Sequence, residues 1–373
     1  MVREYSWSLA SIGLVVCIIM LIMSKPFVTY GFPKNNNVTQ GVKLFFLIFT
    51  LNMIFSFWEW DTYHSWWGFM GVSRYEEFKL SGAYEPVYLW LTKVSGTHYF
   101  VWRALIWGPA CFFIYFAGKK LDILNRNFLL SISLFMAFLT CTRNLLGISM
   151  LLVGLILLID DKNHSRLLGV ALIIASYFFH KSMFITILFA LLALIPQNRK
   201  SVVILLLFFP FVSAGTTYVI DNIVSSDWAN TLGAAGEGGN MLVYYATKER
   251  AVSTLFGNLN KIITYFPQYL ALMYVTKRVI FDKCLVNDYH ERSWTFLCKF
   301  AFVCIYIASA FYFTETSGWI YERFKYMGMI PLTFVVAKVW STEPKTNMWI
   351  KSLILLQMFS LAVRWFLQYY QWS

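Results

Sequence analysis

Three side chains that could bind and protonate an anionic group stand at the ends of long apolar segments: Arg143, His180 and Arg323. A count of the apolar segments between them places all three at the same membrane surface. Arginine keeps its charge and binds phosphate oxygens in pairs, and histidine can give or take a proton near neutral pH. Ionisable groups in a bilayer are costly, so this arrangement predicts a site for an anionic, lipid-borne substrate.

Other polar residues are predicted to lie at the same surface. Lys181 adds a point charge beside His180. Glu85, Asp61 and His180 are the candidates for taking a proton from a hydroxyl group. We favour Glu85 as the base and His180 as a contact to the anion, while the converse assignment stays open. Weaker candidates for the same cavity are Arg103, Glu322 as a partner of Arg323, and Tyr326 as a lipid or sugar contact.

Each of these residues also has an ordinary structural interpretation. A lone arginine at the end of a span commonly extends to the lipid headgroups. A histidine there often bonds a backbone carbonyl, and interfacial tyrosines form an aromatic belt. The functional interpretation is favoured because several cations and a histidine share one surface.

The composition of the chain indicates a polytopic helical membrane protein with one integral domain over residues 1–373. The chain is 58% hydrophobic and only 13% charged, which is more apolar than a soluble core requires. Hydropathy predicts about twelve transmembrane helices, since roughly 20 apolar residues cross a bilayer. They lie near 7–23, 43–58, 99–117, 128–142, 144–159, 166–180, 181–196, 201–215, 258–277, 296–313, 321–340 and 348–366.

Lysine and arginine set the orientation, because they concentrate in cytoplasmic loops. They mark every second connection, which predicts that both termini are periplasmic. Two long loops, about 59–98 and 216–257, then face the periplasm. Within the first loop, residues 85–91 predict a short amphipathic helix with Pro86 in its first turn. The net charge of +12 is explained by the short cytoplasmic loops, which are rich in lysine and arginine, and it requires no nucleic-acid partner.

Cofactor motifs are absent from the sequence. It has no phosphate-binding glycine loop, no His-Glu-x-x-His and no Gly-x-Ser-x-Gly turn. The six cysteines form no Cys-x-x-Cys pair and are predicted to be small core residues. We therefore expect neither a metal nor a cofactor.

An ordered set of motifs over roughly residues 45–335 resembles the EpsG branch of bacterial polysaccharide polymerases. The matching motifs are Asp61-x-Tyr63-His64, Glu85-Pro-x-Tyr88, Thr142-Arg143-Asn144-x-x-Gly147-Ile148, Ala175-Ser176-x-x-x-His180-Lys181-Ser182 and Tyr321-Glu322-Arg323-Phe324-x-Tyr326. The chain departs from the family pattern at Asn144, where glutamine is common, and at Val87, where glycine is common.

This resemblance implies a Wzy-like polymerase of O-antigen or another surface polysaccharide in the bacterial inner membrane. Its substrates would be glycans on undecaprenyl pyrophosphate, as donor and as acceptor, and a chain-length regulator is a further partner to test. The implied fold is all-helical and related to C-type membrane glycosyltransferases (GT-C) and O-antigen ligases. A lipid-linked oligosaccharide flippase and a membrane acyltransferase are the alternatives.

Overall fold

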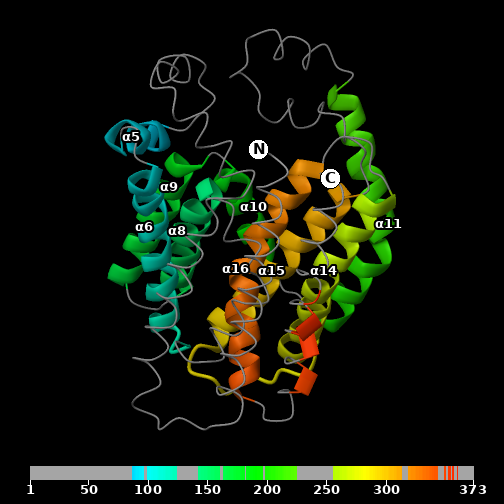
Figure 1. The fold of residues 1–373 in the computed structure, drawn as a ribbon. Coiled ribbons are helices and arrows are strands. Elements are labelled where there is room, and N and C mark those ends of the chain that lie inside the picture. The colour runs from blue at the N-terminus through cyan, green and yellow to red at the C-terminus, as the bar shows by residue number, and fades with distance from the viewer. Residues whose placement is uncertain are drawn as a thin grey trace.

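The helices of the protein run roughly side by side along one common direction (Figure 1). The computed structural model describes residues 86–95, 99–123, 142–159, 163–180, 182–195, 198–224, 255–312 and 318–342, and parts of 348–359. All regular structure within these ranges is helical, as predicted. The main helices are α5 (Pro86–Ser95), α6 (Tyr99–Lys120), α8 (Thr142–Ile159), α9 (Asn163–Phe179), α10 (Met183–Leu194), α11 (Arg199–Val224), α14 (Leu255–Thr276), the π-helical η3 (Lys277–Phe281), α15 (Glu291–Tyr312) and α16 (Gly318–Thr342).

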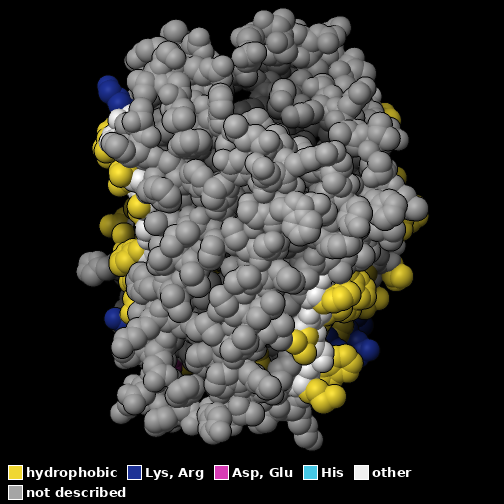
Figure 2. All heavy atoms as spheres, in the orientation of Figure 1, with side chains coloured by type: hydrophobic (Ala, Val, Ile, Leu, Met, Phe, Trp, Pro, Cys, Tyr) yellow, Lys and Arg dark blue, Asp and Glu magenta, His cyan; other side chains and the backbone are white. Residues whose placement is uncertain are grey.

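Helix α11 has the surface of a helix that is surrounded by lipid. Its segment Arg199–Val219 is long and apolar enough to cross a bilayer, and almost none of it is buried. Leu207 and Phe211 are 70% and 71% exposed. A soluble protein does not leave such an apolar face in water. Hydrophobic side chains also cover both lateral edges of the molecule in Figure 2.

The core consists of closely packed helix pairs, α8 with α9 and α15 with α16. Small residues allow the close approach: a Cβ atom at Gly154 would lie 2.8 Å from the Gly169 carbonyl oxygen and 2.7 Å from Ile173. At the second pair, a Cβ atom at Gly328 would lie 3.0 Å from the Ala301 carbonyl oxygen. Glycine at helix contacts of this kind is characteristic of membrane bundles.

The predicted spans agree with the helices over much of the described chain. Helices α6, α8, α9, α14, α15 and α16 cover the spans predicted near 99–117, 144–159, 166–180, 258–277, 296–313 and 321–340. The spans near 7–23, 43–58 and 128–142 lie outside the described residues, and so does most of 348–366. The full count of spans and the GT-C relationship therefore stay predictions.

Helix α10 differs from the prediction of a full span over 181–196. It has only 12 residues, Met183–Leu194. At about 1.5 Å per residue it covers about 18 Å, which is shorter than the roughly 30 Å of a hydrocarbon core. The helical run is interrupted between His180 and Ser182. There the Nδ1 atom of His180 accepts a hydrogen bond from the Ser182 backbone N–H.

The span predicted near 201–215 ended at residue 215, whereas helix α11 continues to Val224. The extension is stabilised by side chains that bond back to carbonyls one turn earlier: Thr216 to Val212, Thr217 to Ser213 and Asn222 to Tyr218. The second long loop therefore begins after Val224. Polar residues that hydropathy assigns to a loop are here the end of a helix.

The short helix predicted after residue 85 is confirmed as α5, which begins at Pro86. Val87 and Leu91 pack inward, whereas Trp90 and Val94 are exposed. Because residues four apart lie on one helix face, α5 is amphipathic. It lies at one end of the bundle beside α6 (Figure 1) and contacts α9 as well.

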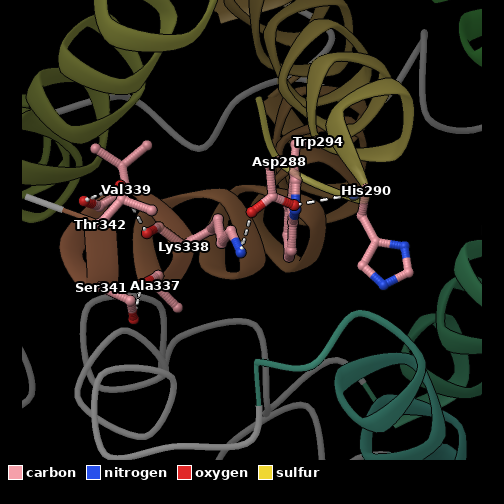
Figure 3. Close-up of polar contacts among 8 residues, drawn as sticks. All are labelled: Asp288, His290, Trp294, Ala337, Lys338, Val339, Ser341 and Thr342. Carbon is pink, nitrogen blue, oxygen red and sulfur yellow. Dashed lines mark hydrogen bonds and ion pairs between the residues drawn. The ribbon is translucent and has the colours of Figure 1, made fainter. Parts of the chain in front are cut away.

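At the opposite end, a charged cluster joins the turn before α15 to the end of α16 (Figure 3). The Lys338 ammonium lies 2.5 Å from a carboxylate oxygen of Asp288. The other oxygen accepts the Trp294 indole N–H at 3.0 Å and the His290 backbone N–H at 2.9 Å. Burial raises the pKa of Asp288, but these hydrogen bonds outweigh it and leave the pKa below its usual value.

Candidate functional site

The candidate site is built around His180, which lies at the break between α9 and α10. Its backbone N–H donates to the Ser176 carbonyl at 3.1 Å and so completes the last turn of α9. Only 4% of the residue is exposed. The next turn begins at once, because the Met183 N–H donates to the His180 carbonyl at 2.9 Å. The imidazole is therefore held in the interior by a rigid bend.

The hydrogen bonds of His180 define which ring nitrogen carries the proton. The Ser182 backbone N–H donates to Nδ1 at 3.1 Å. A backbone N–H can only donate, so Nδ1 is an unprotonated acceptor. The Ser182 hydroxyl, 2.6 Å from the same nitrogen, then donates as well. The proton of the neutral ring therefore resides on Nε2, which makes this nitrogen a hydrogen-bond donor.

Helix α8 meets this bend one turn after Arg143. A Cβ atom at Gly147 would lie 3.5 Å from the His180 Cβ atom and 3.1 Å from the Met183 side chain. Arg143 and Gly147 are four residues apart and lie on the same face of α8, about 6 Å apart along its axis. The backbone of Arg143 is therefore close to the bend, although its side chain lies outside the described residues.

Helix α16 meets the following turns of α10 near Arg323. The Thr186 hydroxyl lies 2.7 Å from the Met327 sulfur. The Phe189 and Phe324 rings form an edge-to-face pair, with ring centroids 5.1 Å apart. Arg323 precedes Phe324 and lies on the same face as Met327, four residues later. Its backbone is therefore beside α10, while its side chain lies outside the described residues.

The described contacts place α8, which carries Arg143, against the bend at His180, and α16, which carries Arg323, against α10 at Thr186 and Phe189. The roles of Arg143, His180 and Arg323 in binding or catalysis stay predictions. The side chains of Arg103 in α6 and Glu322 in α16 are not described, and Glu85, Asp61 and Lys181 lie outside the described residues entirely. Tyr326, predicted to contact lipid or sugar, belongs to the hydrophobic core and is 9% exposed.

Sequence reasoning missed Lys325, the unassigned position of the motif from Tyr321 to Tyr326. It is 1% exposed, eight residues into a membrane-length helix. Its ammonium lies 2.8 Å from the ring centroid of Tyr265 on α14 and 5.1 Å from that of Tyr326. A desolvated cation–π contact is worth about 2 kcal/mol. Removing an ammonium from water costs several kcal/mol, which is more than a single cation–π contact returns.

A signal for Lys325 was present in the sequence. Lys325 lies inside the span predicted near 321–340, and an ionisable residue inside a span is a candidate functional residue. The sequence analysis gave weight to charges at span ends and passed over this one. Elsewhere in the described ranges, no three side chains of histidine, cysteine, aspartate or glutamate come together as a metal site would require.

These features define a class: a helical membrane protein with a buried histidine at a break between two helices. The exposed apolar segment of α11, long enough to cross a bilayer, supports this class. The family is established separately. The model of the EpsG family matches residues 42–373, so the chain belongs to the EpsG family. No curated protein and no solved structure matches it. The family supports a membrane protein of polysaccharide biosynthesis.

Proposed function

We propose that this protein is a glycosyltransferase that polymerises oligosaccharide repeat units carried on undecaprenyl pyrophosphate. It would act at the periplasmic face of the bacterial inner membrane and make O-antigen or a related surface polysaccharide. The observation that carries the proposal is the corner around His180. A buried imidazole there has its donor nitrogen defined, α8 with Arg143 contacts the bend, and α16 with Arg323 contacts α10 one turn later at Thr186.

The reaction requires cations at the leaving group. A hydroxyl oxygen of the acceptor sugar attacks the anomeric carbon of the donor, a new C–O bond forms, and the C–O bond to the pyrophosphate breaks. The pyrophosphate leaves with the electron pair, and its growing charge needs positive groups and hydrogen-bond donors. Arg143 and Arg323 suit this because their guanidinium groups bind phosphate oxygens in pairs. Lys181 would add a point charge.

The hydrogen bonds of His180 favour different roles for His180 and Glu85, the two candidate proton carriers. A ring whose Nδ1 already accepts two hydrogen bonds is poorly suited to take another proton there, whereas Nε2–H suits a phosphate oxygen. The hydroxyl proton would then go to Glu85, with Asp61 as the other candidate. Glu85 precedes α5, and α5 contacts α9, the helix that ends beside His180.

The principal test is reconstitution of purified protein with a defined undecaprenyl-pyrophosphate oligosaccharide. We expect Arg143→Ala and Arg323→Ala each to lower polymer formation on the order of 10² to 10³-fold, as loss of one charge-stabilising donor does. Arg199→Ala is the matched control, because Arg199 is an exposed arginine at the start of α11 and contacts Phe281. Unchanged polymer length in both site variants would contradict the proposed arginine roles.

Deletion in cells separates this proposal from the alternatives. Loss of a polymerase leaves single repeat units that are still exported to the surface. Loss of a flippase instead causes repeat units to accumulate inside, and loss of an acyltransferase leaves polymer of normal length without its acyl groups. A chain-length regulator, if it binds, would alter the length distribution of the polymer without being needed for the bond-forming step.

A further inference from the structure

Thr186, near the start of α10, is fully buried and bonds the bend that carries His180. Its backbone N–H donates to the Ser182 carbonyl oxygen at 3.2 Å, and its hydroxyl lies 3.1 Å from the same oxygen. Ser182 in turn donates its backbone N–H to Nδ1 of His180 at 3.1 Å. Ser182 is therefore held from both sides, by the imidazole through its N–H and by Thr186 through its carbonyl.

The same hydroxyl also contacts a second helix, α16. It lies 2.7 Å from the sulfur of Met327, which is fully buried as well. Helix α10 packs mainly against α15, and its contacts with α16 are fewer, so each of them matters for the relative placement of the two helices. Met327 follows Arg323 by about one helical turn. A connected set of contacts therefore runs from the imidazole through Ser182 and Thr186 to the turn of α16 that carries Arg323.

Aromatic packing holds the same turn of α16 through Phe324. Its ring forms edge-to-face pairs with Phe189 of α10 and Phe311 of α15, with ring centroids 5.1 and 5.6 Å apart. Such ring pairs are ordinary in an apolar core and explain why the turn is rigid. The Thr186 hydroxyl differs from them, because valine would fill nearly the same volume. What the hydroxyl adds at this position is a pair of directed contacts, one to each half of the proposed site.

We propose that Thr186 is a positioning residue of the reaction, which sets the placement of the His180 imidazole relative to the turn of α16 that carries Arg323. The inference rests on the proposed function, in which His180 and Arg323 both bind the leaving diphosphate. Groups that bind one diphosphate must keep a fixed separation, since a misplacement of about 1 Å can cost about 100-fold in rate. Thr186 acts through these two residues and does not itself touch the substrate.

The test compares two buried threonines of the full-length protein in the reconstituted polymerisation assay. Thr333 of α16 is the matched control, because it is 2% exposed and its hydroxyl also donates to a carbonyl one turn earlier, that of Met329, at 2.9 Å. Thr186→Val should lower kcat about 10-fold or more while the KM for the donor stays the same. Thr333→Val should change neither. Both variants lose one bond within a helix, so their melting temperatures should be similar, and Thr186→Ser should recover most of the kcat.

Met327→Leu tests the other end of the contact, because leucine keeps the volume and removes the sulfur. It should also lower kcat, and the double change of Thr186→Val with Met327→Leu should be no worse than the more damaging single change, as expected for two residues that act through one contact. Unchanged kcat in Met327→Leu, multiplied effects in the double variant, or equal kcat in Thr186→Val and Thr333→Val would overturn the positioning role and leave the proposed function standing. If the unaltered protein forms no polymer from the defined substrate, the proposed function fails and the positioning role fails with it.

Discussion

The donor role of His180 can be tested with side chains that imitate one ring nitrogen at a time. Glutamine places an amide N–H near the position of Nε2, and asparagine imitates Nδ1 instead. If His180 donates to the leaving diphosphate, His180→Gln should retain roughly tenfold more polymerisation than His180→Ala, because a charge-assisted hydrogen bond is worth about 1.5 to 3 kcal/mol. His180→Asn should resemble alanine. Initial rates of polymer formation at fixed donor concentration measure both.

The opposite result is equally informative for this residue. An amide cannot take a proton, so a catalytic base at His180 predicts that glutamine, asparagine and alanine are equally inactive. Ser182→Ala adds a second measurement at the bend. It removes the hydroxyl that bonds Nδ1 but keeps the backbone bond, and it should lower the rate by about 3- to 10-fold, the value of one ordinary hydrogen bond.

At the scale of elements, the α8–α9 pair depends on the absence of a side chain at Gly154. An alanine there would place its Cβ atom 2.7 Å from Ile173 and 2.8 Å from a carbonyl oxygen of the facing helix. Gly154→Ala should therefore destabilise the protein by about 1 to 3 kcal/mol, the usual cost of overpacking. Gly215→Ala is the matched control, because nothing lies within 4 Å of its Cβ position on α11. Melting curves in detergent compare the two, and equal melting temperatures would contradict the close packing.

The charged cluster between α15 and α16 predicts how stability depends on pH. Desolvation lowers the pKa of His290, and the hydrogen bonds described above leave the pKa of Asp288 below its usual value. In both cases the unfolded chain binds the proton more readily, so stability falls as the pH falls. The loss begins near the usual value of 6.5 for histidine and continues below 3.8 for aspartate.

Asp288→Asn should remove the lower part of this dependence, since an amide does not titrate. Melting temperatures at about five pH values between pH 8 and pH 3 measure this pH dependence of stability. Asp282→Asn is the control, because Asp282 forms an exposed pair with Arg278 within η3 and its turn. A variant curve that matches the unaltered protein below pH 4 would exclude Asp288 as the titrating group.

At the scale of the whole molecule, long apolar runs were enough to predict α8, α9, α15 and α16, because burial in lipid and burial in the core both require such runs. They did not predict the break before α10, because that break involves a hydrogen bond from the Ser182 backbone N–H to the side chain of His180. They also did not predict the α10–α16 contact through Thr186 and Met327, which joins residues 141 positions apart. Lys325 lies within a predicted span and could have been found, but its contact with Tyr265 of α14 is a tertiary contact that no sequence pattern predicts.

The predicted orientation gives the last test, which concerns the whole chain. The bend at His180 should face the periplasm, and the turn between η3 and α15 the cytoplasm. Tyr289 in that turn is 94% exposed, so Tyr289→Cys should react with a membrane-impermeant maleimide only after the cells are permeabilised. Ala235→Cys in the second long loop should react in intact cells. Cys111, Cys298 and Cys304 are buried and should stay unlabelled. The half-buried Cys284, and Cys17 and Cys141 outside the described residues, are first replaced by serine. Labelling of residue 289 in intact cells would invert the topology and place the proposed site on the wrong side for an exported substrate.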